Sequence, residues 1–134
     1  MAILLDADVV IRGEKRSFDL QRWLIEHKDE ELAAASITIA ELWHGVERAT
    51  TAKQRSLRQK YLNTIVSSLP IIPYTQTTAL EHARLWAYLE KTGKMIGYYD
   101  LIVSATALER GDSVATFNVK HFKRVPNLKV IQPS

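Results

Sequence analysis

The sequence predicts a single α/β domain in which a parallel sheet lies between layers of helices. Its 134 residues match the usual size of one compact domain. Short apolar runs alternate with longer amphipathic segments, the pattern typical of parallel strands joined by helices. No linker, internal repeat or low-complexity segment interrupts this alternation. We therefore treat residues 1–134 as one domain with a three-layer αβα architecture.

The expected strands are short apolar runs bounded by acids, prolines or glycine. They are Ile3–Leu5, Ala33–Ile39, Pro70–Pro73, Ser113–Thr116 and Leu128–Ile131. The expected helices are Phe18–His27, Ile39–Arg48, Ala52–Leu69, Thr77–Lys91 and Leu101–Glu109. In the basic helix over 52–69, helical spacing predicts a buried face of Leu57, Tyr61, Leu62, Ile65 and Val66.

Composition excludes several classes of protein. Hydrophobic residues make up 46% and charged residues 25%, which excludes a disordered or fibrous chain. The absence of cysteine excludes disulfides, zinc fingers and thiol catalysis, and it fits a reducing compartment. No apolar run approaches the roughly 18 residues of a membrane span, and the start lacks a basic signal-peptide region. We expect a cytoplasmic protein without a membrane partner.

Charge is distributed unevenly along the chain. The net charge is +3, but no acid occurs from Arg48 to Leu80 or after Asp112. Such basic segments attract polyanions, nucleic acid first, although they also simply solvate helix faces. The candidate RNA contacts are Arg48, Lys53 and Lys120.

Polar residues gather where the expected strands end, and ligands of open parallel sheets bind at that edge. The candidates are Asp6 and Asp8 after the first strand, Glu41 after the second, Thr116 and Asn118 after the fourth, and Asp100 at the start of a helix. Each of the acids has a structural alternative. Asp6, Asp8 or Asp100 could cap a turn or a helix, and Glu41 could form a capping box with Thr38.

Several carboxylates at one edge point to metal chemistry. Like charges about 4 Å apart repel by roughly 4 kcal/mol at an effective dielectric of 20. The cluster therefore needs raised pKa values or a cation, and its oxygen ligands favour Mg²⁺ or Mn²⁺ over zinc. Such a site suits in-line displacement at phosphorus, the chemistry of a nuclease.

Other site chemistries lack their motifs. The chain has no phosphate-binding glycine loop and no nucleophile elbow. The four histidines lack the spacing of metal ligands and are interpreted as surface or core fillers. The three tryptophans are interpreted as core residues, although Trp43 is also a candidate for lining a groove that binds a partner.

Four segments together resemble the PIN-domain family, and specifically its VapC-type toxins. They are Leu4–Ile11, Ser36–Arg48, Ile96–Ala107 and Ala115–Phe122, in the family's order and at family-like separations. The resemblance implies a metal-dependent endoribonuclease that cuts structured RNA, such as tRNA or ribosomal RNA, and arrests translation. It also implies a homodimer inhibited by a cognate VapB-like antitoxin.

The resemblance assigns roles to the candidate residues. The acids at Asp6 and Asp100 correspond to those that hold Mg²⁺, and Glu41 completes the catalytic set. Asp8 stands where the family usually has Asn, and it is a further candidate ligand. In place of the family's frequent fourth acid the chain carries Asn118 and His121; Thr116 and Asn118 are expected to hold water or phosphate.

Two alternatives remain open at this point. A PIN-like module without catalysis would bind RNA or a protein partner, as the missing fourth acid allows. A haloacid-dehalogenase-type phosphatase would explain Asp6-x-Asp8-x-Val10 but would leave Glu41 without a role.

Overall fold

The fold is built around five parallel strands. The structure is a computed structural model that describes residues 1–134. The strands are β1 (Ala2–Leu5), β2 (Glu31–Ala35), β3 (Ile71–Ile72), β4 (Ser113–Ala115) and β5 (Val130–Ile131). They are ordered β3-β2-β1-β4-β5, with Leu4 opposite Ala33 on one side and Val114 on the other. The predicted α/β class with a central parallel sheet is therefore confirmed.

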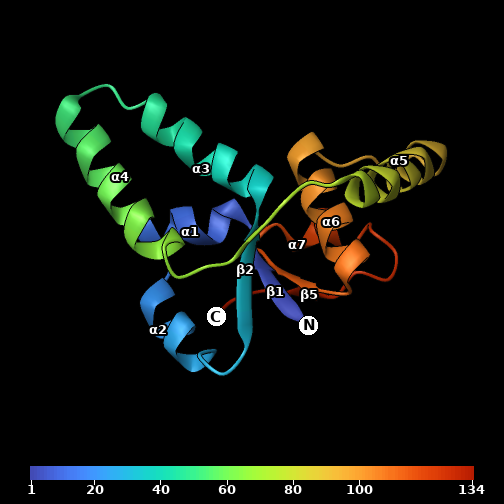
Figure 1. Cartoon of the computed structure of the whole chain (residues 1–134), viewed down its shortest axis with the longest axis horizontal. Helices are drawn as coiled ribbons and strands as arrows, with labels where there is room; N and C mark the ends of the chain where they lie inside the picture. The colour runs from blue at the N-terminus through green and yellow to red at the C-terminus, as the bar shows by residue number, and fades with distance from the viewer.

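Seven helices surround the sheet (Figure 1). They are α1 (Ala7–Glu14), α2 (Leu20–Glu26), α3 (Ser36–Glu47), α4 (Ala52–Val66), α5 (Gln76–Lys91), α6 (Tyr98–Arg110) and α7 (Val119–Phe122). None of them combines the length and apolar character that a membrane-spanning helix requires.

The alternation of side chains along β1 explains the three layers. Ala2 and Leu4 belong to the core that packs against α6 and α7, whereas Ile3 and Leu5 belong to the core that packs against α1 and α2. All four residues are buried, as expected for a central strand covered on both faces. β1 therefore places the residue that follows it, Asp6, in the interior.

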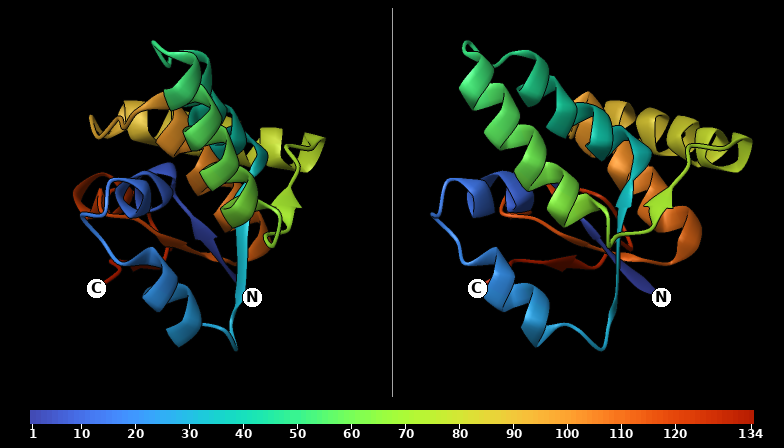
Figure 2. Two further views of the ribbon diagram at one scale, coloured as in Figure 1. Left: turned by 90° about the vertical axis from the view of Figure 1, so that its left-hand side faces the viewer. Right: turned by 60° about the vertical axis from the view of Figure 1, so that its left-hand side comes forward.

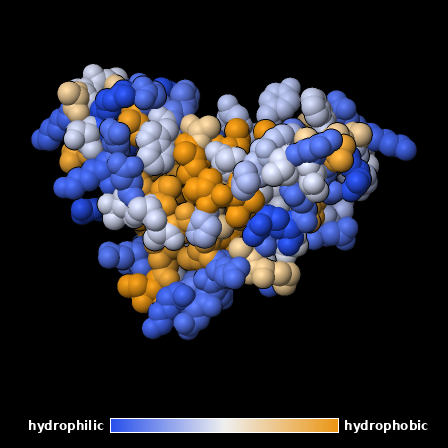
Figure 3. All heavy atoms as spheres, in the orientation of Figure 1, coloured by the Kyte–Doolittle hydropathy of each residue, from blue (hydrophilic) through white to orange (hydrophobic).

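Two helical pairs extend from this core (Figures 1 and 2). The antiparallel hairpin of α3 and α4 packs on α1 through Ala7, Val10, Leu42, Val46 and Leu62. On the other side, α5 packs on α6 around Leu85, Leu89 and Leu101. Figure 3 shows the face between the two pairs, where apolar side chains lie at the base of a hollow.

Several boundaries differ from the sequence prediction by a few residues, most clearly that between β2 and α3. The strand expected to run to Ile39 ends at Ala35, and α3 begins at Ser36. Residues 36–39 are Ser-Ile-Thr-Ile, an apolar, β-branched run that periodicity alone does not separate from a strand. The sequence prediction also missed two helices: α1, which starts directly after the acid that ends β1, and the four-residue α7.

The exposed face of α4 also differs from prediction. Leu62 is buried and Tyr61, Ile65 and Val66 pack beside it, as expected, but Leu57 is 60% exposed. Leu57 precedes Leu62 by five residues, which places it about 140° around the helix from the buried Leu62. Trp23 is buried as predicted, whereas Trp86 on α5 is 41% exposed because α5 packs only its Leu85–Leu89 side on α6.

Candidate active site

Four carboxylates meet beside the carboxyl ends of β1 and β4. Asp6 follows β1 and caps α1, with Oδ1 accepting from the Ala7 N–H at 2.9 Å. Asp8 lies in the first turn of the same helix, Glu41 in the second turn of α3 and Asp100 in the first turn of α6. Three separate helices thus deliver acids to one edge of the sheet, as the sequence predicted.

Thr116 ties the first carboxylate to the end of β4. Its hydroxyl donates to Asp6 Oδ2 at 2.8 Å and lies 3.4 Å from Asp8 Oδ2. The same oxygen accepts from the Asn118 N–H at 2.9 Å, so the threonine is bonded on both sides. The Phe117 N–H donates to Asp8 Oδ2 at 3.0 Å. The loop after β4 therefore orients both aspartates.

Asp100 is held by the N-cap residue of the short helix α7 and by one residue within that helix. Asn118 Nδ2 donates to Asp100 Oδ2 at 3.1 Å and lies 2.9 Å from His121 Nδ1. The same His121 nitrogen is 3.6 Å from Asp100 Oδ2. His121 thus lies where the family resemblance placed it, beside Asn118, and its interpretation from spacing as a filler was wrong. The signal was its position one helical turn after Asn118.

The structural alternatives for these acids apply only in part. Asp6 does cap a helix, yet its second oxygen faces the site. Thr38 and Glu41 form no capping box, because α3 begins at Ser36 and has no side-chain cap. Asp100 is not an N-cap either, since Gly97 occupies that position. Glu41 and Asp100 are therefore not needed to begin their helices.

Burial and mutual repulsion shift the acids toward their protonated forms. Burial, followed by the charge of Asp8, raises the pKa of Asp6 to about 8. Burial, then the charges of Asp100 and Asp8, raises the pKa of Glu41 to about 7. Burial likewise raises the pKa of Asp8 and of Asp100. These influences show that the four carboxylates interact with one another.

Unpartnered polar atoms concentrate in the same region. Four buried side-chain atoms lack a hydrogen-bond partner: Asp8 Oδ1, Glu41 Oε1, Thr38 Oγ1 and Ser104 Oγ. Thr38 lies one turn before Glu41 on α3, and Ser104 lies one turn after Asp100 on α6. Each buried polar atom without a partner lowers the free energy of unfolding by about 1–3 kcal/mol. The four atoms therefore leave hydrogen-bonding groups at this site that a ligand can use.

The donor chemistry fits a divalent cation. No three acids or histidines of the chain lie close enough together to coordinate one metal ion in this structure. The unpaired oxygens of Asp8 and Glu41 nevertheless lack a positive partner, and the pKa values of all four carboxylates are raised. Carboxylate oxygens are the ligands that Mg²⁺ and Mn²⁺ prefer.

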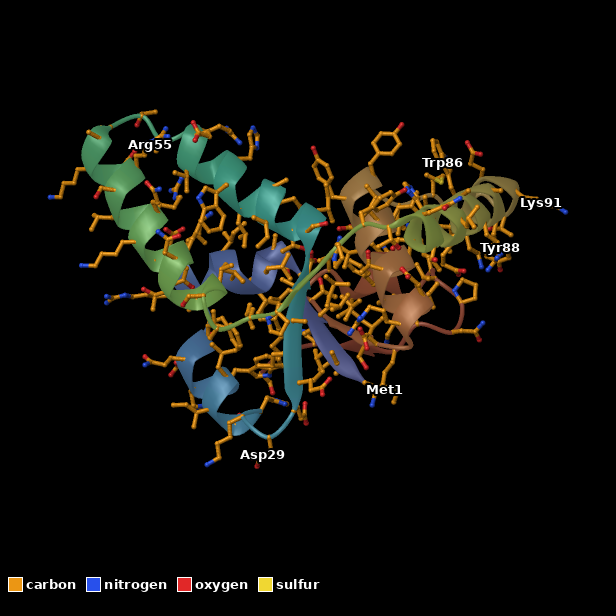
Figure 4. All side chains as sticks on the ribbon, viewed as in Figure 1. Met1, Asp29, Arg55, Trp86, Tyr88 and Lys91 are labelled. Atoms are coloured by element: carbon orange, nitrogen blue, oxygen red, sulfur yellow. The ribbon has the colours of Figure 1, made fainter.

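The candidate RNA contacts lie at different distances from this site. Lys120 is exposed on α7, beside Asn118 and His121. Arg48 caps the end of α3, seven residues beyond Glu41, which is about 10 Å along a helix axis. Lys53 starts α4 at the same hairpin tip, where Figure 4 labels Arg55. The structure does not bring Arg48 and Lys53 to the carboxylates.

A family comparison agrees with this arrangement. The PIN domain family model matches residues 3–128, which include every candidate acid. The chain belongs to the PIN-domain family.

Within the PIN-domain family the chain groups with VapC proteins. It is 34% identical to Ribonuclease VapC2 of Rickettsia felis over 101 residues, which cover 75% of this chain and 73% of that protein. It is 26% identical to the tRNA(fMet)-specific endonuclease VapC of Salmonella typhimurium over 97% of this chain and 96% of that one.

A solved structure shares the whole fold. The crystal structure of VapBC2 from Rickettsia felis, bound to a DNA fragment from their promoter, superposes with a TM-score of 0.91. The match covers 100% of both chains at 27% identity. This PIN-domain assignment removes the basis for the phosphatase alternative.

Proposed function

We propose that this PIN-domain protein is a Mg²⁺-dependent endoribonuclease and the toxin of a VapBC-type pair, cutting structured RNA such as tRNA or ribosomal RNA. The observation that carries the proposal is the convergence of Asp6, Asp8, Glu41 and Asp100, two of them with unpaired buried oxygens. The ribonuclease names of its VapC relatives support the reaction class. The tRNA-specific relative supports the substrate class.

The proposed roles follow from the contacts. Asp6, Asp8 and Asp100 would hold the cation, with Thr116 orienting Asp6, and Asn118 and His121 orienting Asp100. A bound divalent cation supplies positive charge that activates water and neutralises the charge developing on the phosphate. Glu41, whose pKa is raised to about 7, is suited to accept a proton at Oε1 near neutral pH.

A VapB-like antitoxin is the proposed protein partner. The support is the VapBC2 complex, which shares this fold over the full chain. The hollow between the α3–α4 hairpin and the α5–α6 pair offers a surface of apolar character for such a partner (Figure 3). The homodimer stays a prediction of the family resemblance.

The test is expression of the protein with sequencing of new RNA 5′ ends. We expect growth arrest with discrete cuts from the wild type, and at least about a hundredfold less cleavage from Asp6→Asn and Asp100→Asn. Asp29→Asn is the matched control, because Asp29 is an exposed loop acid far from the site (Figure 4). Chelation of divalent cations should abolish cleavage by the purified wild type.

The opposite result would favour a binding module without catalysis. The replacement of the family's fourth acid by Asn118 and His121 is the observation on its side. Soluble wild-type protein that binds RNA equally with and without Asp6→Asn, and cuts none, would establish that module.

A further inference from the structure

Arg12 lies at the edge of the carboxylate site in a fixed position. It occupies the last turn of α1, four residues after Asp8, and therefore lies on the same side of the helix. Its guanidinium carbon sits 4.3 Å from the centroid of the Phe117 ring. That ring is in turn held by an edge-on contact with Phe18, with centroids 5.1 Å apart. Arg12 is thus an oriented cation on an aromatic support.

The guanidinium of Arg12 has unused donors. Most arginines of the chain bond to a carboxylate or a carbonyl oxygen. No such bond is made by the guanidinium groups of Arg12, Arg16 and Arg48. Of these three, Arg12 packs on an aromatic ring, that of Phe117, beside the acids. A cation–π contact occupies none of the N–H donors, so they remain available to a ligand.

The position of Arg12 couples it to the site. The backbone N–H of Phe117 donates to Asp8 Oδ2 at 3.0 Å, so the supporting ring and the carboxylate belong to one loop-to-helix contact. The charge of Arg12 also lowers the pKa of Asp8, against the larger opposing effect of burial. Arg12 is therefore close enough to the acids to act on a group bound beside them.

We infer that Arg12, supported by Phe117, is a phosphate-binding subsite that anchors the RNA backbone beside the carboxylates. The inference rests on the proposed ribonuclease function for the identity of the phosphate. An anionic chain that approaches four carboxylates needs a fixed cation at their edge. A guanidinium fork binds phosphate through paired N–H donors, which a lysine cannot reproduce. The predicted contacts Arg48 and Lys53, at the hairpin tip, cannot serve this position.

The first experiment tests the anion site without RNA. The Nε–H signal of Arg12, assigned by its loss in Arg12→Gln, is followed by NMR while inorganic phosphate is added. We expect a saturating shift that sodium chloride of the same ionic strength does not produce. No phosphate-specific shift would overturn the inference, whatever the protein does to RNA.

The second experiment measures RNA binding in the inactive Asp100→Asn background. We expect Arg12→Gln to weaken binding of labelled poly(U) and of bulk tRNA about tenfold, the effect of one charge-assisted hydrogen-bonded contact. The slope of log affinity against log salt should fall by about 0.7 for poly(U), since one phosphate contact is lost. Arg12→Lys should keep most of the slope but lose affinity.

Controls separate the subsite from general charge effects. Arg22→Gln removes the same charge from α2, where Arg22 forms an exposed ion pair with Glu26, and should leave binding unchanged. Equal binding by Arg12→Gln and its parent would overturn the subsite while leaving the ribonuclease proposal intact. A wild type that shifts with phosphate but cuts no RNA would retain the anion site and refute the ribonuclease.

Discussion

At the scale of single residues, burial and the neighbouring negative charges favour the protonated forms of Asp6 and Glu41. Asp6 and Glu41 have pKa values raised to about 8 and about 7, above the ordinary 3.8 and 4.5. Between the ordinary and the raised pKa values, these two groups therefore bind more protons in the folded protein than in the unfolded chain. Stability from these two groups is present at low pH and is lost as pH rises through the folded pKa.

This sign gives a pH prediction. Without divalent cations, we expect the Tm to fall between about pH 5 and pH 8 as the acids ionise. Glu41→Gln should flatten the decline, and Mg²⁺ at the upper pH should restore the Tm of the wild type more than that of Glu41→Gln. Thermal unfolding in a chelating buffer across this range is the measurement. A Tm that rises with pH would contradict the assignment of raised pKa values.

Two buried threonines provide a matched pair. Thr116→Val removes the donor to Asp6 and the acceptor for the Asn118 N–H, so we expect a loss of about 1–3 kcal/mol in the free energy of unfolding. Thr38→Val replaces an unpartnered hydroxyl and should be neutral or stabilising by about 1 kcal/mol. Urea unfolding of both variants measures the change in the free energy of unfolding. Equal losses in the two variants would show that the Thr38 hydroxyl also has a hydrogen-bond partner.

At the scale of elements, two helical glycines face different surroundings. A Cβ on Gly13 of α1 would lie 2.6 Å from Tyr61 Oη and 2.7 Å from Leu20 Cβ. A Cβ on Gly45 of α3 would meet nothing closer than 3.8 Å. Gly13 thus permits the close approach of α4 and the chain entering α2.

We expect Gly13→Ala to destabilise and Gly45→Ala to stabilise. Overpacking at Gly13 costs about 1–3 kcal/mol, against a gain in helix propensity of at most about 1 kcal/mol. It also disturbs the hydrogen bond from Tyr61 to the Val10 carbonyl. Gly45→Ala should keep the propensity gain. Chemical denaturation of the two variants tests the contrast, which equal effects would contradict.

The sequence predicted elements unevenly, for physical reasons. Alternating apolar runs were enough to predict the parallel sheet, and strand ends were enough to bring the four acids to one edge. α1 was missed because Asp6 ends a strand and begins a helix within a single residue. Its Ala7-Asp8-Val9-Val10 opening has no separate start signal.

Contacts between distant elements were beyond sequence reasoning. The family resemblance placed His121 at the site, but residue spacing did not, because its partner Asp100 is on another helix, 21 positions earlier. The contact of Arg12 with Phe117 could not be predicted from spacing, because Phe117 lies after β4, far from Arg12 in the sequence. Leu57 was expected on the buried face of α4, but spacing alone does not tell how wide the covered face of a helix is.

At the scale of the whole molecule, a buried acid joins the start of the chain to its last third. Asp112 Oδ1 accepts from the Ala2 N–H at 2.8 Å, and Oδ2 accepts from Arg110 Nε at 2.7 Å. The Asp112 side chain is 2% exposed, so removing it leaves the buried Ala2 N–H without its partner. The contact fixes where β1 begins relative to β4.

We expect Asp112→Ala to lower the free energy of unfolding by about 2 kcal/mol, as the loss of a buried, charge-assisted pair requires. Glu26→Ala is the control, because its ion pair with Arg22 is exposed on both sides. That pair should contribute at most about 1 kcal/mol. Both values come from urea titration, and an Asp112 effect no larger than the control would refute this role.

The bond between Thr116 and Asp6 spans 110 positions of the chain. A ribosome synthesises Asp6 among the first residues, but the hydroxyl that orients it, and the loop that holds Asp8 and Asp100, emerge near the end. A chain interrupted between Asp100 and Thr116 therefore carries all four acids without the contacts that orient Asp6, Asp8 and Asp100. If the protein cuts RNA as proposed, a chain interrupted before Thr116 would therefore be inactive.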